Sequence, residues 1–156
     1  MLSKEGFWVM PLLQKGVAMA AGRMPKIIKP QAHAVIDYLV AGTFFMTAAI
    51  YWRRSKRAAV SSLICGGVTT VNSILTDYPG GIWKVMSFQT HGKLDAGVAA
   101  LTATMPRLMA FGDDAESKFF TMQSIAETAV TAMTDFDYYE HPASDRLRHE
   151  DEEQVA

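Results

Sequence analysis

Cysteine is almost absent from this sequence of 156 residues, which contains Cys65 alone. A single cysteine cannot form an internal disulfide, and it cannot build a cysteine-based metal cluster. Because Cys65 lies in the apolar run SLICGG, we interpret it as a small core residue and not as a nucleophile.

An excess of positive charge is also lacking. The 15 Lys and Arg residues face 16 Asp and Glu residues, which gives a formal net charge of −1. No segment interleaves basic and aromatic side chains, so nucleic acid is not a predicted partner. The Gly-x-Ser-x-Gly elbow and a phosphate-binding glycine loop are missing as well. We therefore predict no catalytic residue, and a non-catalytic role is favoured while enzymatic activity stays open.

Signals for β-strands are poor, because no run of alternating polar and apolar residues is bounded by hairpin turns. The chain has only 6 prolines and as many as 10 methionines. Its apolar runs are long and rich in Ala, Leu and Met, which is typical of helices. The sequence therefore predicts an all-α fold.

The sequence repeats itself after 58 positions. A shift by this length superimposes two His-x-x-x-Asp motifs and two Thr-Asp-aromatic motifs without a gap. The matched residues are His33 with His91, Asp37 with Asp95, Thr70 with Thr128, and Thr76-Asp77-Tyr78 with Thr134-Asp135-Phe136. This pattern predicts two tandem copies of one helical hairpin.

Each copy has the same predicted plan, in which one helix opens at the histidine and a return helix ends at Thr-Asp. We expect helices at roughly 31–52, 58–77, 89–110 and 116–135. The segment DYPGG stops the first return helix, since proline cannot continue a helix and glycine permits the turn. Two antiparallel hairpins of this kind form a four-helix up-down bundle.

The chain divides into three predicted regions. Residues 1–29 form an amphipathic N-terminal segment, and residues 30–137 form the duplicated-hairpin bundle. Copy one of the hairpin occupies 30–80, and copy two occupies 88–137. Residues 138–156 are polar and acidic, which predicts a disordered tail.

Long uncharged stretches favour a membrane location. Residues 58–76 carry no charge over 19 positions, and such a helix is about 28 Å long, close to the thickness of the hydrocarbon core. Residues 38–52 are also uncharged, end in aromatic residues and precede the basic segment RRSKR, as is typical of a membrane boundary. We therefore predict a multi-pass transmembrane protein of the cell membrane, with membrane lipid and other membrane-protein subunits as partners.

The second copy fits this prediction less well. Arg107 comes before its first helix is long enough to cross, and Glu127 lies in the middle of its second helix. A soluble helical bundle that binds a protein partner therefore stays open as an alternative. The basic segment 53–57 favours a cytoplasmic position for that loop, whereas the basic residues at 23–29 on the opposite side argue against it.

Residues 75–114, LTDYPGGIWKVMSFQTHGKLDAGVAALTATMPRLMAFGDD, resemble the SPW-repeat membrane proteins, which are small bacterial proteins with two copies of a helical hairpin. The resemblance rests on the His-x-x-x-Asp motif at the start of the hairpin, the Leu-Thr-Asp-Tyr motif at its end and a proline near the far end of its first helix. It covers roughly residues 30–137. Met105-Pro106-Arg107 stands where the family has Ser-Pro-Trp. The resemblance implies a four-helix integral membrane protein and supplies no catalytic residues.

The duplication brings both polar motifs to the same end of the bundle. The predicted cluster consists of His33, Asp37, Asp77, His91, Asp95 and Asp135. We favour a structural interpretation, in which these side chains form a polar clasp that fixes the register of the hairpins. The alternatives are a metal site, a tetrapyrrole held by His33 or His91, and proton handling by the cluster together with Glu127 as an intramembrane carboxylate.

These observations lead to a small integral membrane protein with a structural or accessory-subunit role and no predicted cofactor. A membrane protein that binds a metal or cofactor through the His/Asp cluster is the main alternative.

Overall fold

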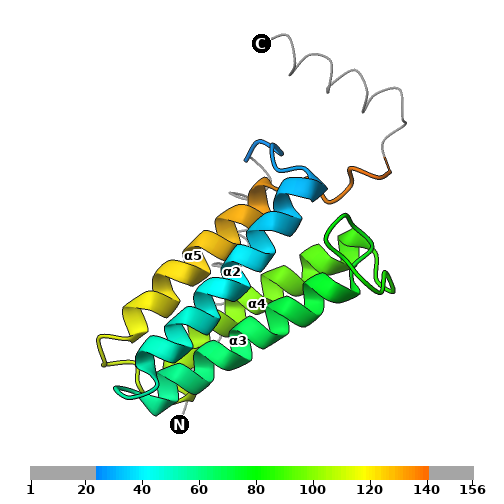
Figure 1. The fold of residues 1–156 in the computed structure, drawn as a ribbon. Coiled ribbons are helices and arrows are strands. Elements are labelled where there is room, and N and C mark those ends of the chain that lie inside the picture. The colour runs from blue at the N-terminus through cyan, green and yellow to red at the C-terminus, as the bar shows by residue number, and fades with distance from the viewer. Residues whose placement is uncertain (1–23, 141–156) are drawn as a thin grey trace.

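A computed structural model describes residues 24–140 of the chain, and this part is helical, with four helices and no strand (Figure 1). The helices are α2 (Pro30–Tyr51), α3 (Lys56–Leu75), α4 (Phe88–Leu108) and α5 (Ser117–Met133). The predicted all-α fold is therefore confirmed for the described residues. Residues 1–23 of the predicted amphipathic segment and residues 141–156 of the predicted tail lie outside them.

Two of the four helices start at a serine that caps them. Ser55 and Ser87 precede α3 and α4, and each hydroxyl oxygen accepts a hydrogen bond from a backbone N–H three residues later. Pro30 occupies the first turn of α2, where its missing N–H leaves no hydrogen bond unmade.

Both return helices end two residues earlier than the sequence predicted. Thr76 and Thr134 follow the last residues of α3 and α5 and have an extended backbone, with φ of −84° in both cases. Extended backbone turns successive side chains to opposite sides. The threonine of each Thr-Asp motif is therefore buried, whereas the Asp77 side chain is 62% exposed.

Two antiparallel hairpins make up the bundle, with α2 packed on α3, α4 on α5, and α3 on α4 (Figure 1). Their ends are joined crosswise. Ile28, just before α2, pairs with Thr134 after α5, and Met86, just before α4, pairs with Thr76 after α3. The two pairings are related by the 58-residue shift found in the sequence. They bring the start of α2 to the end of α5, and the start of α4 to the end of α3.

Buried apolar side chains form two clusters among the described residues. Phe44, Met105, Phe111 and Phe120 pack around Cys65 toward the end with the short hairpin loops, so Cys65 is the core residue that the sequence predicted. Ala34, Tyr78 and Phe88 form a second cluster at the opposite end.

The buried face of α3 is made of small and polar residues, whereas its exposed face is apolar. The buried face of α3 consists of Ala58, Ala59, Ser61, Ser62, Cys65, Gly66, Thr69, Asn72 and Ser73. Its exposed face carries Val60, Leu63, Ile64, Val68 and Val71. α2 shows the same arrangement, with Leu39 and Met46 more than 60% exposed. α2 and α3 are also long and apolar enough to cross a membrane, by length and composition.

Candidate metal centre

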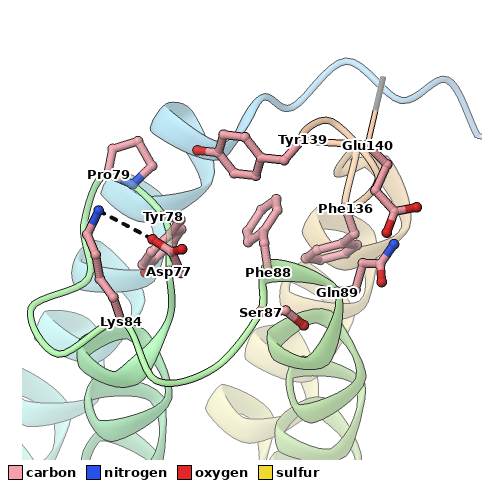
Figure 2. Close-up of a pocket in the computed structure, with 10 residues that line it drawn as sticks. All are labelled: Asp77, Tyr78, Pro79, Lys84, Ser87, Phe88, Gln89, Phe136, Tyr139 and Glu140. Carbon is pink, nitrogen blue, oxygen red and sulfur yellow. Dashed lines mark ion pairs between the residues drawn. The ribbon is translucent and has the colours of Figure 1, made fainter. Parts of the chain in front are cut away.

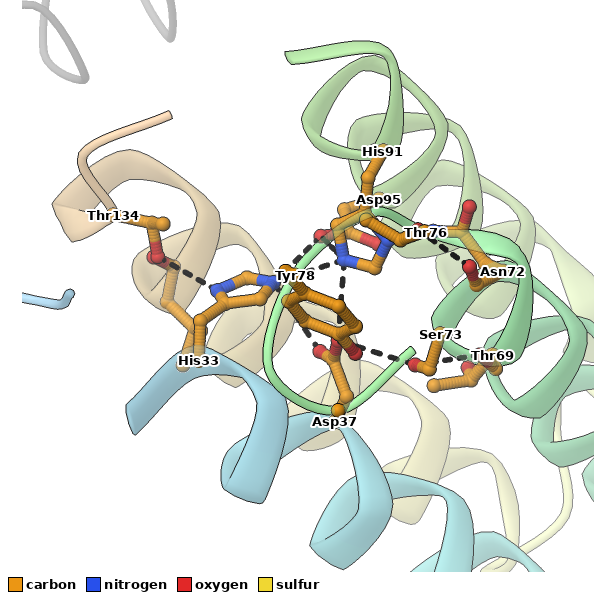
Figure 3. Close-up of polar contacts among 12 residues, drawn as sticks. His33, Asp37, Thr69, Asn72, Ser73, Thr76, Tyr78, His91, Asp95 and Thr134 are labelled. Atoms are coloured by element: carbon orange, nitrogen blue, oxygen red, sulfur yellow. Dashed lines mark hydrogen bonds and ion pairs between the residues drawn. The ribbon is translucent and has the colours of Figure 1, made fainter. Parts of the chain in front are cut away.

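Four polar side chains converge inside the bundle at the end where α2 and α4 begin (Figure 3). His33 and Asp37 lie one turn apart on α2, and His91 and Asp95 lie one turn apart on α4. A spacing of four residues places both members of each pair on the same helix face. One nitrogen or oxygen atom from each side chain lies within 4.8 Å of the other three.

Two threonine hydroxyls fix the orientation of the imidazole rings. His33 Nδ1 lies 2.8 Å from Thr134 Oγ1, and His91 Nδ1 lies 2.8 Å from Thr76 Oγ1. Each hydroxyl donates its only proton to the backbone carbonyl four residues earlier, at 2.7 Å. The hydroxyl oxygen therefore accepts a hydrogen bond from the imidazole, so Nδ1 of each ring carries a proton, and Nε2 presents a lone pair when the ring is neutral.

The two Nε2 atoms lie 3.1 Å from each other, and both face the carboxylates. His33 Nε2 lies 3.3 Å from Asp37 Oδ1 and 3.0 Å from Asp95 Oδ2. His91 Nε2 lies 3.1 Å from Asp37 Oδ2 and 3.0 Å from Asp95 Oδ2. Because the lone pairs of four side chains converge here, the cluster requires a cation between them, which is either added protons or a metal ion.

Two uncharged side chains donate hydrogen bonds to the carboxylates from outside the cluster. The Asn72 amide donates to Asp95 Oδ1 at 2.7 Å, and the Tyr78 hydroxyl donates to Asp37 Oδ2 at 2.9 Å. Burial and the neighbouring Asp37 carboxylate raise the pKa of Tyr78 above its ordinary value, so its hydroxyl keeps the proton that it donates. These bonds orient the carboxylates without neutralising their charge.

An aromatic layer covers the imidazoles at the rim of the bundle. Phe88 packs against both rings, with centroids 5.4 Å from His33 and 5.8 Å from His91. Phe136 lies 5.3 Å from His33, and Tyr78 lies 5.2 Å from His91. Both histidines are consequently almost fully buried, with exposed fractions of 1% and 0%.

The outer side of this aromatic layer forms the wall of a rim pocket of about 340 Å³. Figure 2 shows this pocket between the α3–α4 connection and the segment after α5. Tyr78, Phe88 and Phe136 line it, and the same three rings contact the imidazoles on their other side. They therefore separate the pocket from the polar cluster.

The structure brings together four of the six residues that the sequence placed at this end: His33, Asp37, His91 and Asp95. Asp77 and Asp135 lie outside this group. The Asp77 carboxylate lies 3.3 Å from Lys84 Nζ, and Asp135 Oδ1 accepts a hydrogen bond from the backbone N–H two residues later. The early end of each return helix explains this difference, because it turns the threonine, and not the aspartate, toward the histidines.

Five residues of the site were not recognised in the sequence: Asn72, Ser73, Thr76, Tyr78 and Thr134. The repeated Thr-Asp-aromatic motif contained a signal for three of them, since it marked these positions as equivalent in the two copies. The Asn72 side chain, in a stretch of 19 uncharged residues, was a second signal, because a buried amide needs a polar partner.

Glu127 is close to the cluster without belonging to it. Its side chain, on α5, is 8% exposed, and it lines a small cavity together with His33, Asp37 and Asp95.

Comparisons of the chain with known protein families, with curated proteins and with solved structures give no match. The resemblance to the SPW-repeat proteins therefore stays a prediction from the sequence.

Proposed function

We propose that the protein is a membrane-embedded four-helix bundle that binds one divalent transition-metal ion between His33, Asp37, His91 and Asp95. The convergence of two imidazole lone pairs and two carboxylates on one buried point carries this proposal. Because both Nδ1 protons are committed to threonine hydroxyls, the Nε2 atoms are available as ligands.

The spacing of the four groups supports a small metal ion. With metal–ligand bonds of about 2.0–2.1 Å, as zinc forms, the ligand atoms of a tetrahedral site lie about 3.3 Å apart. His33 Nε2, His91 Nε2 and Asp95 Oδ2 lie 3.0–3.1 Å from one another. The nearest Asp37 oxygens lie 3.3 Å from His33 Nε2 (Oδ1) and 3.1 Å from His91 Nε2 (Oδ2), and one ligand atom from each of the four residues lies within 4.8 Å of the others. Imidazole and carboxylate together suit zinc and neighbouring first-row metals.

The surroundings of the ligands support the same proposal. Metal-binding histidines in proteins commonly donate their second N–H to an oxygen, which fixes the ring and raises its basicity. The two threonines supply that oxygen here. A dication would also balance the two aspartates, which are costly to bury with a net charge of minus two.

The distribution of apolar side chains supports the membrane location. Large aliphatic residues face outward on α2 and α3 while serine, threonine and alanine face inward, and small residues are the usual means of helix packing in lipid. Trp52 stacks under Lys56 at one end of the bundle, and Trp83 is 68% exposed at the other end. Tryptophans at both ends are typical of the two membrane interfaces.

The second hairpin is compatible with this location. The exposed charged residues of α4 are Lys93 and Arg107, near its two ends, where long basic side chains reach the interface. Glu127, in the middle of α5, is buried inside the bundle. We propose a multi-pass arrangement with the basic 53–57 segment in the cytoplasm, as the positive-inside rule favours.

Metal analysis of the full chain, purified in detergent, tests the function. We expect about one equivalent of zinc or another divalent transition metal per chain, as a four-ligand site binds. The His33→Ala/His91→Ala variant should lose it, whereas Asp77→Ala, which changes a carboxylate outside the cluster, should keep it. If the double variant does not accumulate, Asp37→Asn/Asp95→Asn removes two ligands with little change in shape.

The second candidate is the structural clasp, in which added protons take the place of the metal and the bundle acts as an accessory subunit. It is favoured by the fact that the ligand separations, at 3.0–3.3 Å, are also hydrogen-bond distances. Sub-stoichiometric metal in the wild-type protein, unchanged in the double variant, would reject the metal centre and leave the clasp.

A further inference from the structure

A small cavity lies beside the candidate metal centre, on the side that faces α5. Three of the proposed ligands, His33, Asp37 and Asp95, form part of its wall, and Glu127 faces them from α5. Its volume is about 30 Å³. A water molecule needs about 10–15 Å³ of such space, so the cavity has room for a water beside three of the proposed ligands.

Glu127 is the unexplained group in this cavity. Its side chain is 8% exposed, and neither carboxylate oxygen makes a hydrogen bond of good geometry among the described residues, although the Thr102 and Gln123 side chains lie near it. A buried carboxylate without a well-formed hydrogen bond is costly, and in this cavity it lies opposite three of the proposed metal ligands.

The remaining walls leave few other acceptors for a water molecule. Ile36, Val40, Val98 and Val130 line the cavity with apolar side chains. Thr69 and Thr131 also line it, and the Thr69 hydroxyl donates to the Cys65 carbonyl at 3.0 Å, so that its oxygen can only accept. Glu127 and Thr69 are therefore acceptors for the two protons of a metal-bound water, and Thr131 adds a further hydroxyl to the wall.

We propose that the cavity is a fifth coordination position of the metal centre, beyond the four protein ligands, filled by a water that binds the ion through oxygen and donates to Glu127 and Thr69. This inference rests on the proposed function, because the water needs the ion. A bound dication polarises its water and makes the protons stronger donors. Glu127 acts here as a positioning residue, and the position accepts ligands with one heavy atom, such as water or hydroxide.

The test uses the full chain loaded with cobalt(II), which takes the coordination of zinc and is paramagnetic. Electron paramagnetic resonance is recorded in ordinary water and in water enriched in oxygen-17. We expect the enriched water to broaden the cobalt signal, because the bound oxygen couples to the electron spin. In Glu127→Leu, which fills the cavity and removes the acceptor, the broadening should disappear while cobalt remains bound. The exposed Glu140→Leu is the matched control and should retain the broadening.

The outcomes separate this inference from the proposed function. A wild-type protein that binds no cobalt contradicts the metal centre itself. Cobalt that binds without broadening in the wild type overturns the fifth position, and this result needs no variant. Broadening that persists in Glu127→Leu overturns the assignment of Glu127.

Discussion

Among the single residues of the site, Thr76 and Thr134 have the largest influence on what the cluster can bind. Each hydroxyl gives its proton to its own helix and accepts a hydrogen bond from one imidazole. If the hydroxyls were missing, nothing would hold the ring proton on Nδ1, and Nε2 would lose its fixed direction toward the cluster. The threonines thus turn two buried histidines into two ligands.

Replacement of Thr76 or Thr134 by valine keeps the shape of the side chain and removes the acceptor. We expect each variant to lower metal affinity by about 10–100-fold, which is the usual effect of deleting an outer partner of a metal ligand. Titration with a metal-buffered series measures this change. Thr70→Val is the matched control, because Thr70 also donates to a carbonyl four residues earlier but contacts no histidine. Equal affinities in all three variants would show that the hydroxyls do not orient the rings.

Of the four helices, α3 shows most clearly how the interior is built. Its buried face carries small and hydroxyl-bearing residues, which let α2 approach closely and also supply Asn72 and Ser73 to the cluster. Gly66 marks the closest approach, since a Cβ atom there would lie 2.9 Å from the Phe44 Cβ atom and 3.2 Å from the Phe45 ring. The neighbouring Gly67 has open space instead.

The two glycines provide a matched pair of variants for the packing of α2 on α3. We expect Gly66→Ala to destabilise the protein by about 1–3 kcal/mol, because the added methyl group forces the helices apart. Gly67→Ala should be neutral or stabilising by about 0.4–1 kcal/mol, since alanine restricts the unfolded chain and nothing obstructs the methyl group. Thermal unfolding in detergent measures both. Equal midpoints for the two variants would contradict the close approach.

The helices and half of the site could be predicted from the sequence because both depend on local spacing. A four-residue separation places His33 and Asp37 on one helix face, and the 58-residue repeat places His91 and Asp95 at the same end. The partners of the histidines depend on how the hairpin ends pair. The crosswise pairing of Ile28 with Thr134 joins residues more than 100 positions apart, and no local pattern reports it.

The outer donors to the carboxylates were unpredictable for the same physical reason. Whether Asn72 faces α2, α4 or lipid depends on the rotation of α3 in the bundle, and its hydrogen bond to Asp95 fixes that rotation only in the folded protein. Asp77 and Asp135 were placed in the cluster because the last helical residue cannot be located within two positions from sequence.

The molecule as a whole has an apolar surface around a polar interior. The proposed membrane location depends on this arrangement. Ile64 lies near the middle of α3 and is 40% exposed. We expect Ile64→Lys to impair insertion, because a lysine at the centre of a span costs about 2.5–3.5 kcal/mol. The share of the variant recovered in the membrane fraction measures the effect.

Ile82→Lys is the control for this substitution. Ile82 is 67% exposed and lies between α3 and α4 at the end of the bundle, where lysine is tolerated at a membrane interface. In a protein surrounded by water, both surface changes would be within about 0.5 kcal/mol of neutral. Equal recovery of the two variants, without detergent, would support the soluble alternative.

A metal bound at the polar end would connect α2 to α4, which belong to different hairpins, and so join the two halves of the molecule. X-ray absorption at the metal edge of the purified full chain tests this claim most directly. We expect a first shell of nitrogen and oxygen at about 2.0–2.1 Å, with the outer scattering of two imidazoles and no sulfur. A shell that contains sulfur, or fewer than two imidazoles, would contradict the His33, Asp37, His91 and Asp95 centre.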